Sequence, residues 1–247
     1  MKIDKKDSNT KPNNILGDEY TLFRALLPLL PEVGNFMEIG SRNGRDHCYS
    51  LYKNGWSGFC VEANPDIAWG GLLETYGHEP RVKTFNYFIS DKRGLTKFCI
   101  ENTPNSGVSS AFYNRATGID SGISRPLKKI IEVPSIPLID FWKENDQPKI
   151  DLLMLDIEGY DASVLLSTDF SIFSPKFIMA ETGTCYYHIE PHEKSNGITV
   201  WNMIIEHMKK FGYELIMTNN DFDYKKRYCP ELMDIPMNGV WVRRGAQ

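Results

Sequence analysis

The sequence contains few cysteines, no long apolar run and no excess of basic residues. Its five cysteines are scattered through 247 residues without a C-x-x-C pair, which argues against a disulfide framework or a thiolate zinc site. No apolar run approaches the length of a membrane span, and residues 1–14 lack the apolar core of a secretory signal. The formal net charge of -4 provides no footprint for nucleic acid. We therefore expect a cytoplasmic protein with reduced thiols, no membrane span and no nucleic-acid partner.

The length and composition predict a single domain. The chain is 41% hydrophobic and 24% charged, as is usual for a globular protein, and 247 residues suffice for one large core. Residues 1–14 are expected to form a flexible tail and residues 15–247 one domain. Residues 102–125 are rich in Asn, Ser, Gly and Thr. They predict a mobile loop, because a loop this long inside a compact domain is typically a functional lid or disordered.

Short apolar strands alternate with amphipathic helices along most of the chain. The expected strands are residues 35–40, 57–62, 81–91, 149–156, 176–181, 213–218 and 239–242. The expected helices are residues 19–30, 44–53, 65–76, 138–143, 162–166 and 198–211. This alternation predicts an α/β fold with a doubly wound, mostly parallel sheet. Residues 95–101 and 128–134 depart from the pattern and predict a small β insertion.

Acidic residues recur where the expected strands end. Glu38 lies within the first strand, and Glu62, Asp91, Asp156 and Glu181 stand at the ends of later ones. Ligands of open α/β sheets bind beyond the carboxyl ends of the strands, and a buried acid is costly unless it is paired. A single acid of this kind is explained by helix capping. Several at corresponding strand ends predict a polar cleft.

The loop after the first expected strand, F-M-E-I-G-S-R-N-G at 36–44, limits the ligand of this cleft. It does not match G-x-x-x-x-G-K-[ST], since Arg45 and Asp46 follow the second glycine. It also departs from G-x-G-x-x-G, because Arg42 stands where the second glycine would be, and Glu38 would repel a pyrophosphate. An acid at position 38 instead suits a cationic amino group.

Glu62 lies about twenty residues beyond Gly40, at the end of the next strand. A carboxylate placed there accepts hydrogen bonds from the hydroxyls of a ribose. Its alternative role is a strand-end acid in the turn V-E-A-N-P. An amino group and a ribose without a phosphate describe S-adenosylmethionine.

Several motifs together resemble those of FkbM-type S-adenosylmethionine-dependent methyltransferases. They are M-E-I-G-S-R-N-G-R-D, V-E-A-N-P, F-I-S-D-K-R-G, I-D-L-L-M-L-D-I-E-G-Y-D at 150–161 and F-I-M-A-E-T at 177–182. The resemblance implies a class I methyltransferase fold, Rossmann-like, with a seven-stranded sheet closed by an antiparallel strand. It also implies S-adenosylmethionine as methyl donor and O-methylation of a small molecule, sugar or glycan. Glu38 replaces the family's common aspartate, and Met154-Leu155 replaces a frequent lysine, so acceptor details are not carried over.

The expected cofactor-binding residues follow these motifs. They are Glu38, Gly40, Ser41, Asn43, Gly44, Glu62, Ala63, Ser90, Asp91 and Asp156. Phe88 and Ile89, at the end of the third expected strand, are candidates to contact the adenine ring, and ordinary core packing is the alternative for Phe88.

The catalytic candidates are Asp156, Glu158 and His188. Asp156 and Glu158 flank Ile157 and would share a face in extended geometry. Glu158 could be a base or could cap the next helix. His188 is a candidate base because its ordinary pKa lies near neutrality, with His192 as its competitor.

Glu181, Tyr160 and Tyr186 are the candidates to bind the acceptor, and Ser109 and Ser110 could contact it from the 102–125 loop. A divalent metal is possible but not favoured, because the acids lack a diagnostic spacing. Two other functions stay open. One is a nicotinamide-dependent oxidoreductase or epimerase on a similar sheet, and the other is a non-catalytic nucleoside-binding module.

Overall fold

The computed structural model describes residues 19–102, 109–111, 126–183, 197–219 and 236–245. The expected tail at 1–14 lies outside the described residues, as do Tyr186, His188, His192 and most of the 102–125 loop. No helix in these described ranges combines the length and apolar character needed to cross a membrane.

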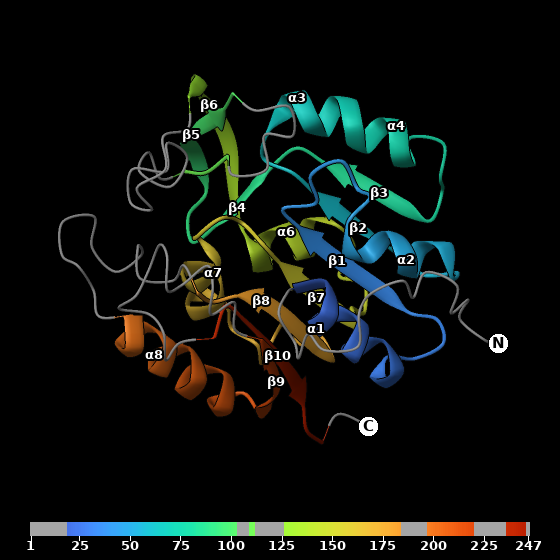
Figure 1. Cartoon of the computed structure of the whole chain (residues 1–247), viewed down its shortest axis with the longest axis vertical. Helices are drawn as coiled ribbons and strands as arrows, with labels where there is room; N and C mark the ends of the chain where they lie inside the picture. The colour runs from blue at the N-terminus through green and yellow to red at the C-terminus, as the bar shows by residue number, and fades with distance from the viewer. Residues whose placement is uncertain (1–18, 103–108, 112–125, 184–196, 220–235, 246–247) are drawn as a thin grey trace.

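Seven strands form the central sheet in the order β3-β2-β1-β7-β8-β10-β9. Their bounds are β1 Asn35–Ile39, β2 Ser57–Val61, β3 Val82–Phe85, β7 Leu152–Leu155, β8 Phe177–Glu181, β9 Tyr213–Asn219 and β10 Asn238–Arg243. The pairings among β3, β2, β1, β7 and β8 are parallel, whereas β10 runs antiparallel to both β8 and β9 (Figure 1). The expected doubly wound sheet with an antiparallel closing strand is confirmed.

Helices cover both faces of this sheet. They are α1 Glu19–Leu26, η1 Leu27–Leu29, α2 His47–Lys53, α3 Pro65–Ile67, η2 Ala68–Leu72, α4 Leu73–Tyr76, α6 Leu138–Glu144, α7 Asp161–Ser167 and α8 Gly197–Lys210. Alternate residues of β1 face opposite sides: Phe36 packs with α1, α2 and α4, whereas Met37 and Ile39 pack with α6, α7 and α8. All three side chains are buried, so the sheet separates two hydrophobic cores.

The expected strand at 81–91 is wrong as a single element. It divides into β3, which pairs with β2, and β4 (Phe88–Ser90), which pairs with β6 (Leu127–Pro137) in a separate sheet of order β4-β6-β5. Between them the Asn86 amide donates to the carbonyls of Glu62 and Ala63 at 2.8 and 2.9 Å, which ties the chain to the turn after β2. β5 (Gly94–Glu101) completes the expected β insertion, beside α3 in Figure 1.

Candidate functional site

The loop after β1 is held against the end of β7 by a glycine without room for a side chain. Gly40 has φ +86°, and a Cβ at this position would lie 1.8 Å from the Asp156 carbonyl oxygen. Ser41 secures the same loop from within. Its hydroxyl donates to the Glu38 carbonyl at 2.6 Å and accepts from the Val61 amide at 3.0 Å. The loop therefore brings the ends of β1, β2 and β7 together.

Arg42 keeps a left-handed backbone although it carries a side chain. Its φ is +47°, in the region that favours glycine. Its amide donates to Glu62 Oε2 at 2.9 Å, and the Asn64 amide donates to Glu62 Oε1 at 2.7 Å. Position 42 thus retains the backbone conformation suited to a glycine. Its N–H, with that of Asn64, positions the Glu62 carboxylate at the end of β2.

Asn43 and Gly44 fasten the loop to α4. Asn43 is exposed, and its carbonyl accepts from the Thr75 hydroxyl at 2.8 Å. The Gly44 carbonyl accepts from the Tyr76 hydroxyl at 2.6 Å, and a Cβ at Gly44 would lie 2.4 Å from the Tyr76 ring. Both residues shape the loop and are not among the residues that line the cavities described below.

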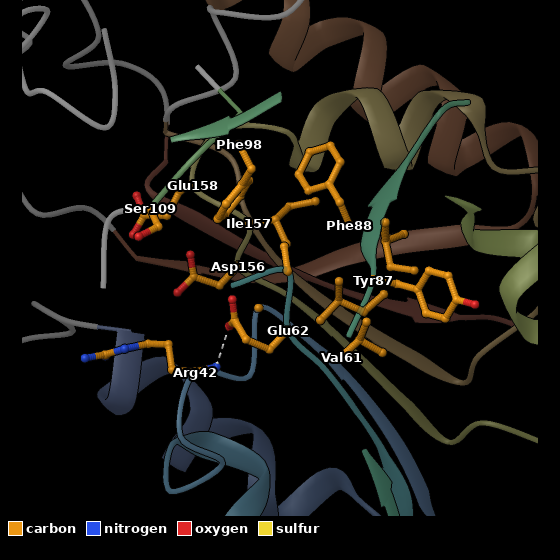
Figure 2. Close-up of a pocket in the computed structure, with 14 residues that line it drawn as sticks. Arg42, Val61, Glu62, Tyr87, Phe88, Phe98, Ser109, Asp156, Ile157 and Glu158 are labelled. Carbon is orange, nitrogen blue, oxygen red and sulfur yellow. Dashed lines mark hydrogen bonds between the residues drawn. The ribbon is translucent and has the colours of Figure 1, made fainter. Parts of the chain in front are cut away.

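A cleft opens where these strand ends meet, which we call the central cleft. It contains about 490 Å³ of free space, including space open to solvent. Figure 2 shows the carboxylates of Glu62 and Asp156 pointing toward the middle of the cleft, with Phe88 and Phe98 beyond them. The lining residues are Ile39, Gly40, Arg42, Val61, Glu62, Ala63, Tyr87, Phe88, Ile89, Phe98, Ser109, Asp156, Ile157 and Glu158. The cleft therefore has an acidic part and an aromatic part.

The turn after β7 does not have the extended geometry that the sequence suggested. β7 ends at Leu155, and Glu158 has φ +52°. Asp161, buried at the start of α7, accepts from the amides of Ile157 and Gly159 at 3.3 Å each. Asp156 and Glu158 both line the cleft because of this turn, and not because they share the face of a strand.

A second cavity adjoins the central cleft, and we call it the α1 cavity. Its lining residues are Glu19, Tyr20, Glu38, Ile39, Gly40, Arg42, Asp46, His47, Met154 and Asp156. Of these, Ile39, Gly40, Arg42 and Asp156 also line the central cleft. Glu38 Oε1 accepts from the Cys48 amide at 3.1 Å, so this acid bonds the first turn of α2 as well as lining the cavity.

The acidic side chains of the site have raised pKa values, so their ionised forms are disfavoured. Burial raises the pKa of Glu38 to about 7. Burial, with the charges of Glu181 and Asp46, raises the pKa of Glu19 to about 8. The pKa of Asp156 lies well above its ordinary value because of burial and the nearby Glu19 and Glu181. Burial also raises the pKa of Glu62. A cation placed among these groups would be stabilised by all of them.

The other expected site residues in the described part of the chain lie close to the cleft without lining it. Ser90 Oγ donates to the Lys92 carbonyl at 2.7 Å and accepts from its amide at 3.1 Å. Asp91 accepts from the Tyr160 hydroxyl at 3.2 Å, and the Tyr160 ring lies 4.9 Å from that of Phe88, centroid to centroid. Glu181 is buried at the end of β8. Tyr160 and Asp91 thus support the aromatic side of the cleft through Phe88.

Sequence reasoning missed Glu19 and Asp161. Glu19 is about twenty positions before the nearest motif, and no local pattern connects the two segments. Asp161 could have been found from the sequence, because an acid just after a glycine turn and before a helix commonly accepts hydrogen bonds from nearby amides. Within the described residues, no group of three or more His, Cys, Asp or Glu side chains could hold a metal ion.

The sheet order β3-β2-β1-β7-β8-β10-β9, with its antiparallel closing strand β10, defines the class I methyltransferase fold. A family model described as the methyltransferase FkbM domain matches residues 38–215, most of the chain. The chain belongs to this FkbM methyltransferase family. Membership favours a methyl donor over the nicotinamide alternative and implies S-adenosylmethionine as the cofactor.

Fifteen chains of solved structures match this chain, and three of them are described below. One comes from a fibrillarin/Nop5p complex, with 14% identity, 90% of this chain and 82% of that chain covered, and a TM-score of 0.44. A candidate caffeoyl-CoA O-methyltransferase from Staphylococcus aureus has 11% identity, coverage of 91% and 81%, and a TM-score of 0.44.

A candidate S-adenosylmethionine-dependent methyltransferase from Listeria monocytogenes has 10% identity, coverage of 90% and 96%, and a TM-score of 0.42. With TM-scores below 0.5, these likenesses carry no functional argument. No curated protein matches this chain.

Proposed function

We propose that this methyltransferase transfers a methyl group to a hydroxyl of a small molecule, sugar or glycan. The observation that carries this proposal is the pair Asp156 and Glu158 on the wall of the central cleft. A hydroxyl loses its proton when its oxygen is methylated, so the reaction needs a proton acceptor near that oxygen. A carboxylate beside the cofactor site supplies one.

The residues of the cleft fit S-adenosylmethionine. Each oxygen of Glu62 accepts one backbone amide, and each has a further lone pair with which it can accept a ribose hydroxyl. Phe88, Ile89 and Ala63 offer an apolar wall for the adenine. Gly40 lines the cleft with backbone atoms alone. The raised pKa values of Glu38 and Asp156 suit a ligand that carries positive charge.

The chain's own groups would then act on the acceptor. S-adenosylmethionine supplies an electrophilic methyl group on a sulfonium. Asp156 and Glu158 would orient the acceptor hydroxyl, and one of them would take the proton that the hydroxyl loses on methylation. A neighbouring positive charge favours the ionised carboxylate that this step requires. His188, beyond the described residues, stays a third proposed base.

A hydroxyl is favoured over an amine as acceptor by the charge of the site. Surrounding acids stabilise a protonated amine, and a protonated amine has no lone pair with which to attack a methyl group. A neutral polyhydroxylated acceptor does not meet this obstacle. We keep Glu181, Tyr160 and Tyr186 as proposed acceptor-side residues, with the 102–125 loop as a proposed lid of a single domain at 15–247.

The test is a screen of methyl transfer to sugars, glycans and hydroxylated metabolites, read by mass spectrometry. Once an acceptor is found, we expect Asp156→Asn or Glu158→Gln to lower kcat by about 10²-fold while S-adenosylhomocysteine still binds. Asp140→Asn, on the exposed side of α6, is the control. Full turnover in both variants contradicts the proposed base. Calorimetric binding of NAD or NADP without S-adenosylhomocysteine contradicts the methyltransferase assignment.

A further inference from the structure

We propose that helix α1, which precedes the residues matched by the family model, supplies Glu19 as the ligand for the amino group at the methionine end of the cofactor. This inference rests on the proposed use of S-adenosylmethionine in the central cleft. In this arrangement, the amino-acid half of the cofactor lies in the α1 cavity. The arrangement also makes an element outside the family domain part of the cofactor site.

Packing fixes α1 over this cavity. Leu22, Phe23 and Leu26 are buried in the core that α1 shares with β1 and α2. At the start of the helix, the Tyr20 hydroxyl donates to Asp46 Oδ1 at 2.9 Å, and the Tyr20 ring stacks on that of His47 with 4.6 Å between centroids. These contacts hold Glu19 in the cavity wall.

The α1 cavity lies where the amino-acid half of the cofactor would extend. It meets the central cleft at Gly40 and Asp156. With the ribose at Glu62 and the adenine at Phe88, the remaining half of the molecule must leave the cleft at another point. Gly40 and Asp156 line both cavities, so the α1 cavity borders the central cleft on this side.

Glu19 is the acid of this cavity best placed to receive an ammonium group. Glu38 already accepts from the Cys48 amide at 3.1 Å and lies 3.9 Å from Cys60 Sγ. Asp46 accepts from Tyr20 and lies 3.6 Å from Arg42 Nη1. The side chain of Glu19 is 23% exposed, and its Oε1 atom lies 3.5 Å from Nε2 of His47.

The negative charges around Glu19 favour the binding of a cation beside it. Glu38, Asp46, Glu158 and Glu181 all act to raise its pKa, after burial as the largest cause. An ammonium group in the cavity would offset this repulsion. The methionine end also carries a carboxylate, and Arg42, which lines the same cavity, provides a guanidinium for it.

Isothermal titration calorimetry with two ligands tests the assignment. S-adenosylhomocysteine contains the amino-acid half, whereas 5′-methylthioadenosine lacks it. We expect Glu19→Gln to weaken S-adenosylhomocysteine by about tenfold or more, as for a lost charge-assisted hydrogen bond, and to change 5′-methylthioadenosine less than about twofold. Glu74→Gln, which removes a side chain 76% exposed on α4, should change neither affinity.

The other outcomes contradict either the role of Glu19 or the use of S-adenosylmethionine. Equal weakening of both ligands, or no weakening of either, overturns the role of Glu19 but leaves S-adenosylmethionine use intact. Absence of binding of both ligands to the wild-type protein overturns the proposed function itself. If Glu19→Gln does not fold, Glu19→Asp retains the charge with a shorter reach. It should then weaken S-adenosylhomocysteine alone, and unchanged affinity contradicts the proposal.

Discussion

At the residue scale, Gly40 is where the loop after β1 and the end of β7 touch. We expect Gly40→Ala to lower the free energy of unfolding by about 2–4 kcal/mol. The new Cβ would lie 1.8 Å from the Asp156 carbonyl oxygen, and φ is +86°. Relief of the clash would displace the loop after β1, whose Arg42 amide positions Glu62, so S-adenosylhomocysteine binding should be lost as well. Urea unfolding and calorimetry measure both effects.

The matched control for Gly40 is Gly70. A Cβ at Gly70 would meet nothing within 4 Å, and its φ is not in the left-handed region. Gly70→Ala should therefore leave the free energy of unfolding within about 0.5 kcal/mol of the wild type or raise it. A Gly40→Ala protein as stable as Gly70→Ala would show that the loop tolerates displacement.

The residues that sequence could place are those with a local pattern. Gly40, Glu62 and Asp156 each follow an apolar strand, and the common edge of a parallel sheet predicts their proximity. Glu19 has no such pattern. Its place depends on how α1 packs against the sheet, and that packing is set by apolar side chains that carry no information about the cleft.

At the element scale, the turn from β7 to α7 depends on Asp161. We expect Asp161→Ala to lower the free energy of unfolding by about 2–4 kcal/mol, since the amides of Ile157 and Gly159 would lose a buried acceptor. It should also reduce turnover, because Asp156 and Glu158 are positioned by this turn. Thermal unfolding and steady-state kinetics provide the two readouts.

Asp161→Asn separates the acceptor from the charge. Its amide oxygen can still accept the same hydrogen bonds, and burial together with the charge of Glu181 already raises the pKa of Asp161 well above its ordinary value. We therefore expect Asp161→Asn to be closer to the wild type in stability than Asp161→Ala. The opposite order would mean that the carboxylate charge, and not the hydrogen bonds, holds the turn.

Helices and strands could be predicted from the sequence where one hydrophobic periodicity extends over the whole element. The strands at β1, β2 and β8 lie within a residue or two of their expected ranges. The division of residues 81–91 into two strands could not be predicted, because both β3 and β4 are apolar and extended. What divides them is a side-chain amide of Asn86 bonded to carbonyls some twenty residues earlier. A non-local bond of this kind leaves no trace in local periodicity.

At the scale of the whole molecule, acids from separate elements share one electrostatic environment. Glu19 comes from α1, Glu38 from β1, Asp156 from the end of β7 and Glu181 from β8. Glu38 and Glu181 raise the pKa of Glu19, and Glu19 and Glu181 raise the pKa of Asp156. This mutual repulsion disfavours the ligand-free fold, and a bound cation would relieve it.

The stability of the ligand-free protein should therefore fall as the pH rises. The pKa of Glu38 is raised from 4.5 to about 7, and that of Glu19 from 4.5 to about 8. Since the folded state binds these protons more tightly, their stabilising contribution is complete below the unfolded value. It is lost as the pH rises through the folded values, with a slope of up to about 1.4 kcal/mol per pH unit for each group.

Urea unfolding at intervals between about pH 5 and about pH 8 measures this slope. Glu19→Gln should make the slope shallower, because one titrating group has been removed, whereas Glu74→Gln should leave it unchanged. Saturating S-adenosylhomocysteine should also make it shallower, since the ammonium group stabilises the ionised acids. A stability that rises over this range in all three proteins would mean that these acids are ionised in the folded state, and the electrostatic case for a cationic ligand would fail.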